Sequence, residues 1–126
     1  MNSKLALVSR ILLGLTMLVF GLNKLFNFLP EPEGSPAEAV AFFEALIATG
    51  YMIKLVALCQ VIGGLLLILG KWVPFVIVFL APITVNILCF HLFLDLSKSM
   101  MPALIVTILH LILIYKYKSS FSGLFQ

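Results

Sequence analysis

Four long apolar stretches alternate with short polar segments along the chain. They cover approximately residues 5–22, 51–69, 72–94 and 100–115. Each approaches the length of about 20 apolar residues that a helix needs to cross a bilayer. Because the last three stretches are separated by very short connections, they should form antiparallel hairpins. The pattern predicts an all-α integral membrane protein, with residues 1–126 forming a single antiparallel four-helix bundle.

The long connection between the first two stretches predicts a further, shorter helix over residues 36–49. Its large apolar side chains share one face: Phe42, Phe43, Leu46 and Ile47. At its start, Ser35 could cap the helix and Glu38 could complete a capping box, with Gly50 as a C-terminal stop. We expect a short amphipathic helix at the membrane interface, either as a simple lid over the bundle or as a gate over an opening.

Composition narrows the class of protein further. Hydrophobic residues make up 63% and charged residues 10%, against roughly 45–50% and 25% in a soluble domain, so a soluble or disordered chain is excluded. The net charge of +3 comes from scattered lysines, which does not indicate a nucleic-acid partner. The first apolar stretch is longer than a signal-peptide core and lacks a cleavage motif, so we interpret it as a retained span.

The distribution of basic residues predicts the orientation, because positive charge in short flanks favours the cytoplasmic side. One side carries five basic residues: Lys4, Arg10, Lys71, Lys116 and Lys118. The other side carries three: Lys24, Lys54 and Lys98. We therefore expect both termini in the cytoplasm.

Polar side chains inside a membrane are costly and are candidate functional residues. Gln60, Asn86 and His110 each lie about nine or ten residues from the outer end of their spans, roughly 13–15 Å deep at about 1.5 Å per residue. They are the candidate ligand-binding layer near the midplane. The alternative is structural, because amides and a histidine can also join helices through hydrogen bonds.

A second polar set lies nearer the outer face. Its candidate site residues are Lys24, Glu44, His91 and Asp95, with Asn23 and Lys54 at a similar depth. His91 and Asp95 are four residues apart, so the carboxylate could orient the imidazole. The alternative for the charged members is interfacial pairing or snorkelling.

The sequence gives no sign of a metal centre. The depths of His91 and His110 differ by about 9 Å at 1.5 Å per residue, which disfavours joint ligation of haem or a metal. Cys59 and Cys89 show no zinc-site or redox-pair spacing, and we expect them to pack as apolar groups.

Several motifs together resemble the DoxX family of small bacterial membrane proteins. They are Gly21-Leu22-Asn23-Lys24-Leu25, the run from Gln60 to Leu67 followed by Gly70, the stretch from Pro82 to Asp95, and the aromatic tail around Phe121 and Phe125. The resemblance covers about Arg10 to Phe125. It implies a four-helix fold in the bacterial cytoplasmic membrane. At the position matched to Gln60 the family typically has glutamate, and a glutamine cannot exchange a proton.

The resemblance implies a link to quinone-coupled redox chemistry in some members and to chaperone-like roles in relatives. We expect an accessory or ligand-binding membrane subunit that takes a quinone or a lipid. The alternatives are a membrane oxidoreductase in its own right, with His91 and Asp95 or Lys24 handling protons, and an assembly scaffold. The expected partners are the lipid bilayer and either a membrane protein or a second copy of the chain.

Overall fold

The protein is almost entirely helical. The computed structural model describes residues 3–30, 34–96 and 100–126. Of the residues described, 85% are helical, and no strand occurs among them. The elements are α1 (Ser3–Phe26), α2 (Ala37–Ala48), α3 (Met52–Leu69), α4 (Val73–Phe93), α5 (Met100–Lys116) and the 3-10 helix η1 (Lys118–Phe125). The predicted all-α class is confirmed.

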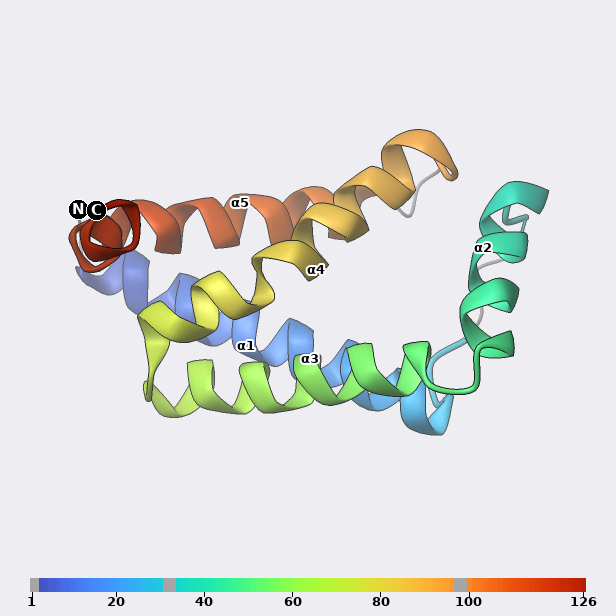
Figure 1. The fold of residues 1–126 in the computed structure, drawn as a ribbon, viewed down its shortest axis with the longest axis horizontal. Helices are drawn as coiled ribbons and strands as arrows, with labels where there is room; N and C mark the ends of the chain where they lie inside the picture. The colour runs from blue at the N-terminus through green and yellow to red at the C-terminus, as the bar shows by residue number, and fades with distance from the viewer. Residues whose placement is uncertain (1–2, 31–33, 97–99) are drawn as a thin grey trace.

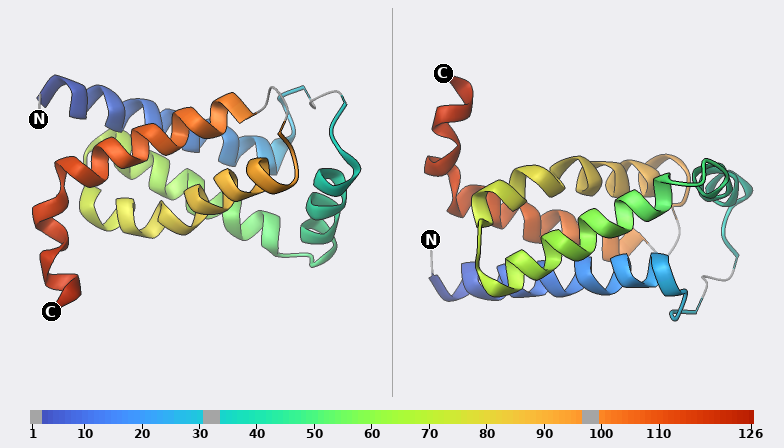
Figure 2. Two further views of the ribbon diagram at one scale, coloured as in Figure 1. Left: turned by 90° about the horizontal axis from the view of Figure 1, so that it is seen from above. Right: turned by 60° about the horizontal axis from the view of Figure 1, so that its bottom comes forward.

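Helices α1, α3, α4 and α5 lie side by side, and α2 lies across one end of them (Figure 1). Both termini are at the opposite end, as expected when four helices run alternately up and down (Figures 1 and 2). Helices α1, α3 and α4 are long and apolar enough to cross a membrane. Helices α5 and η1, which are bent by 77° relative to each other, meet the same test only when the two are counted as one span. The molecule is therefore a multi-pass membrane bundle.

Most of the apolar surface of each long helix faces outward. Of the most apolar window, 33% is buried inside the molecule in α1 and 28% in both α3 and α4. Large side chains such as Leu12, Leu58 and Ile108 are exposed, while Leu13, Leu67 and Leu80 are fully buried. A water-soluble protein would bury most such side chains, whereas in a membrane the surrounding lipid solvates them.

Helices α1 and α3 pack closely through glycines. A Cβ atom at Gly14 would lie 2.8 Å from the Gly64 carbonyl oxygen, and one at Gly64 would lie 2.6 Å from the Gly14 carbonyl oxygen. A Cβ atom at Gly21 would lie 2.9 Å from the Gln60 Cβ. The backbones can approach this closely because no side chain intervenes. These glycines therefore serve packing inside the bundle.

A tight turn joins α3 to α4. The N–H of Lys71 donates to the Leu66 carbonyl at 3.0 Å, and Gly70 has a φ of 73°, which is the left-handed helix ending that favours glycine. The Arg10 guanidinium occupies the space where a Gly70 side chain would be. Positive charge is favourable at a helix C-terminus, so Arg10 supports this end of α3.

The start of α2 differs from the prediction. The helix begins at Ala37, Pro36 occupies the N-cap position, and no side chain caps it. Instead the Pro36 carbonyl accepts the N–H groups of Ala39 and Val40, both at 3.1 Å. The capping box predicted for Ser35 and Glu38 is therefore wrong, because the proline displaces the start of the helix by one residue. Lys98, used in the orientation argument, lies outside the described residues.

Candidate functional site

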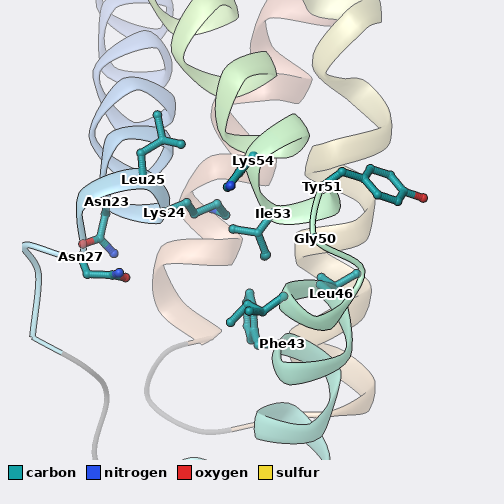
Figure 3. A pocket seen from close by; sticks show the side chains of 11 residues that line it. Asn23, Lys24, Leu25, Asn27, Phe43, Leu46, Gly50, Tyr51, Ile53 and Lys54 are labelled. Atoms are coloured by element: carbon teal, nitrogen blue, oxygen red, sulfur yellow. The ribbon is translucent and has the colours of Figure 1, made fainter.

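A cavity lies at the α2 end of the bundle, between α1, α2 and the start of α3. Its volume is about 380 Å³, within the roughly 300–1,000 Å³ typical of small-molecule pockets. The lining residues are Asn23, Lys24, Leu25, Asn27, Phe43, Leu46, Ile47, Gly50, Tyr51, Ile53 and Lys54. In Figure 3, Lys24 and Lys54 point toward each other at this end of the bundle, while the Tyr51 ring points away from them.

Two lysines dominate the chemistry of this cavity. Lys24 comes from the last turn of α1 and Lys54 from the first turn of α3. Their amino ends converge on the same part of the cavity (Figure 3). Among the described residues that line it, none is acidic. Two ammonium groups without a facing carboxylate favour a ligand that carries negative charge or exposed oxygen atoms.

Asn23 has a structural part in the same region. Its Oδ1 accepts the N–H of Leu29 at 2.8 Å, and its carbonyl accepts the N–H of Asn27 at 2.7 Å. Asn27 adopts a φ of 51°, a left-handed conformation that Asn tolerates better than most residues. These bonds form the turn that ends α1 at Phe26, and they thereby fix where Lys24, in the last turn, enters the cavity.

Helix α2 supplies the apolar wall of the cavity and is held in place by aromatic rings. Phe43, Leu46 and Ile47 face the cavity. The Phe90 ring of α4 lies 5.4 Å from that of Phe42 and 5.0 Å from that of Phe43, measured between centroids. Edge-to-face and tilted aromatic pairs of this spacing are favourable. The predicted amphipathic helix is therefore docked on α4 at the same time as it covers the cavity.

The connection from α2 to α3 is compact. The Thr49 hydroxyl donates to the Leu46 carbonyl at 2.6 Å and accepts the N–H of Met52 at 3.1 Å. Gly50, which also lines the cavity, has a φ of 83° that a side chain would disfavour. This turn positions Lys54 one turn into α3, on the side facing Lys24.

The predicted midplane candidates occupy different environments. Gln60 is buried between α3 and α1, where its Nε2 donates to the Met17 Sδ at 3.5 Å. Its Oε1 is buried without a hydrogen-bond partner. Gln60 therefore links α3 to α1 through its Nε2 while its Oε1 stays unsatisfied. Its role as a ligand-binding residue stays a prediction.

His110 is buried and uses both ring nitrogens within the bundle. Its Nε2 lies 2.9 Å from the Ile77 carbonyl and its Nδ1 lies 2.8 Å from the Thr84 hydroxyl. Since a carbonyl only accepts, the neutral ring donates from Nε2 and accepts the Thr84 hydroxyl at Nδ1. Pro82 nearby has no N–H to donate. The imidazole thus bridges α5 to the proline-containing region of α4.

Asn86 does not face the interior. Its side chain is exposed on α4, whereas Gln60 and His110 are buried. The structure therefore does not bring Asn86 together with Gln60 and His110 inside the bundle, and its assignment as a ligand-binding residue stays a prediction. Matching depth from the helix ends does not fix the direction in which a side chain points, which depends on the rotation of each helix.

The outer-rim candidates are also separated. Glu44 is exposed on α2 and does not line the cavity, while Asp95 is buried directly after α4. The His91 ring lies 5.0 Å from that of Phe90, and its Nδ1 is buried without a hydrogen-bond partner. The predicted contact from Asp95 is therefore not made to Nδ1. Of the four rim candidates, Lys24 alone lines the cavity.

The described residues contain neither a cluster of potential metal ligands nor a disulfide. Within residues 3–30, 34–96 and 100–126, no group of three His, Cys, Asp or Glu residues could hold a metal ion. Cys59 and Cys89 are free thiols. The cavity therefore depends on lysine and amide chemistry.

Two residues that take part in these contacts were not identified from the sequence. Asn27 joins the cavity through the turn after α1, and its spacing of four residues from Asn23 was the available signal. Thr84, the hydroxyl partner of His110, is one residue among many apolar ones in α4, so no pattern marked it. Depth alone places Lys54 in the outer polar set. That it converges with Lys24 depends on how α1 and α3 pack, which the sequence pattern does not show.

Comparison with known proteins identifies the family. The family model for DoxX matches residues 5–92, which include the cavity lysines and both glycine-containing helices. No curated protein and no solved structure matches the chain. The matched range spans well over half of the chain and confirms the resemblance carried by Gly21–Leu25 and the run from Gln60. The chain belongs to the DoxX family.

Proposed function

We propose that this DoxX-family protein is a ligand-binding membrane subunit whose cavity takes the polar head of a lipophilic molecule. The observation that carries the proposal is the cavity of about 380 Å³ in which Lys24 and Lys54 converge, with no acidic side chain among the described residues that line it. The wall that α2 contributes is apolar. An amphiphile with oxygen atoms at one end and an apolar body matches both surfaces.

Within this class, we propose a quinone as the ligand. When bound, a quinone exchanges electrons and protons with redox partners in the membrane. Its carbonyl oxygens can accept hydrogen bonds from the two lysines, and its ring can lie against Phe43 and Leu46. Charge that develops on these oxygens is stabilised by nearby ammonium groups. This assigns the protein an accessory role in membrane redox chemistry, with a lipid headgroup as the competing ligand.

We further propose that the protein resides in the bacterial cytoplasmic membrane with both termini in the cytoplasm. The cavity then opens on the outer side. Residues that could act as a catalytic pair, such as His91 with Asp95, do not line the cavity. This favours a binding role, in which the redox step is carried by a partner, over an oxidoreductase acting alone.

The test is to identify what purifies with the protein. The parent, a Lys24→Gln/Lys54→Gln double variant and a Lys71→Gln control are extracted in mild detergent, and bound small molecules are quantified by mass spectrometry. Lys71 is exposed at the opposite end of the bundle, so its replacement removes a lysine charge without touching the cavity. Circular dichroism confirms that each variant is folded.

We expect quinone at a stoichiometric level with the parent and the control, and at least about tenfold less with the double variant, because each lost charged hydrogen bond costs about 1.5–3 kcal/mol. Phospholipid in place of quinone would keep the cavity as a binding site and overturn the redox assignment. Equal retention by all three proteins would overturn the cavity as the site.

A further inference from the structure

The C-terminal segment leaves the bundle sharply. Helix η1 is bent by 77° from α5 (Figure 2). Tyr117 and Phe121 pack against the core, whereas Leu124 is 64% and Phe125 86% exposed. The segment is therefore attached at its beginning and presents an apolar tip away from the helices. Because α5 packs alongside the membrane-length helices α1 and α4, a bend of this size turns η1 away from the bundle direction and toward the membrane plane.

Aromatic side chains place this end of the bundle at the level of the lipid headgroups. Trp72 is exposed in the turn between α3 and α4, and Tyr115 is exposed near the end of α5. Tryptophan and tyrosine concentrate at membrane–water interfaces. The Lys118 ammonium lies 4.4 Å from the Tyr115 ring centroid, so η1 begins at this same level.

The charge at this end has a single sign. Lys116 and Lys118 flank the bend, and Lys71 lies in the neighbouring turn. Residues 1–30 and 96–126 contain no acidic residue, and Glu38 and Glu44 are on α2 at the opposite end. A protein surface usually offers both signs of charge, whereas an anionic leaflet offers one. The distribution favours lipid as the partner.

We propose that Lys116–Phe125 is a binding surface for anionic phospholipid headgroups. The lysines contact the phosphates, while Leu124 and Phe125 insert at the boundary of the acyl chains. This surface lies at the opposite end from the two-lysine cavity and does not depend on its ligand.

The test is hydrogen–deuterium exchange of the full-length protein in nanodiscs. The lipid is either phosphatidylcholine alone or a mixture of phosphatidylcholine with phosphatidylglycerol, and exchange is followed in the peptide covering residues 117–126. The variant is Lys116→Gln/Lys118→Gln, and the control is Lys54→Gln, which removes one lysine at the opposite end.

We expect exchange in this peptide to slow about fivefold for each lysine when phosphatidylglycerol is added. The slowing should persist in the Lys54→Gln control, disappear in the double variant and weaken at high salt. Equal exchange in the two lipids would overturn the proposal and point to a protein partner or none. A loss of slowing in the control as well would overturn the local assignment.

Discussion

His110 shows how a buried polar residue can be fully used inside a bundle. Both of its nitrogens are bonded, to the Ile77 carbonyl and the Thr84 hydroxyl. Neither nitrogen can bind a ligand without breaking a contact between α4 and α5. At this residue the geometry favours the structural alternative that the sequence left open.

Replacing His110 with leucine should destabilise the bundle. The change leaves the Thr84 hydroxyl and the Ile77 carbonyl without their partner, so we expect a loss of about 1–2 kcal/mol in the free energy of unfolding. Thr84→Val should cost less, and the two changes together should cost less than their sum, because they remove one shared bond. The measurement is a double-mutant cycle by unfolding in mixed detergent micelles.

The matched control for this cycle is Thr107→Val. Thr107 lies on the same helix as His110, but its hydroxyl bonds to the Ala103 carbonyl of its own helix. Strict additivity of His110→Leu and Thr84→Val would contradict the proposed bridge, as would a control that is as damaging as His110→Leu.

At the scale of helices, the contact between α1 and α3 depends on backbone proximity. A Cβ at Gly64 would meet the Gly14 carbonyl and the backbone nitrogen of Leu18, at 2.6 and 2.8 Å. These atoms belong to the backbone of a helix and cannot move aside as a flexible side chain could. The sequence indicated that the glycines share faces, and the structure identifies which helix each face meets.

Gly64→Ala should therefore lower the free energy of unfolding by about 1–3 kcal/mol, the usual cost of overpacking a well-packed interface. Gly123→Ala is the control, because nothing lies within 4 Å of a Cβ at that position. Both are compared by the same unfolding assay. A Gly64→Ala protein as stable as the control would show that α1 and α3 are not in this close contact.

Helix α2 is a second element on which the cavity depends, because it forms the apolar wall. It is attached through the rings of Phe42 and Phe43 on Phe90, and it covers the cavity with the same face. Loss of the Phe90 ring should release α2 while leaving the transmembrane helices intact.

We expect Phe90→Ala to raise amide exchange across residues 37–48 by several-fold and to reduce ligand retention, because each aromatic pair contributes about 0.5–1.5 kcal/mol. Phe93→Ala is the matched control, since this ring on the same helix is 81% exposed. If the two variants exchange alike, α2 is held by other contacts, and its role as a cover must be revised.

At the scale of the whole molecule, hydropathy alone predicted most of the architecture. The helices observed at Ser3–Phe26, Met52–Leu69, Val73–Phe93 and Met100–Lys116 correspond to the four apolar stretches. This is possible because a bilayer demands long apolar helices with internally satisfied backbones, so length and composition constrain the fold strongly.

The site was less predictable for a physical reason. Depth along a helix follows from residue number, but the direction of a side chain follows from how helices rotate and pack. Asn86 has the expected depth and points outward, while Lys24 and Lys54 are 30 residues apart in sequence and meet in one cavity. The ends of helices are the hardest part to predict. There the direction of a side chain depends on the geometry of the turn, such as Asn23–Asn27, and the hydrophobic pattern does not encode that geometry.

Photoaffinity labelling with a short-chain azidoquinone tests the central claim most directly. The protein is labelled in native-like nanodiscs, digested and mapped by mass spectrometry. We predict labelling within residues 43–54, which is lost on competition with the parent quinone and in the Lys24→Gln/Lys54→Gln variant. Labelling centred on the groove between α4 and α5, at residues 81–88 and 107–114, or labelling unaffected by the lysine changes, would contradict the account.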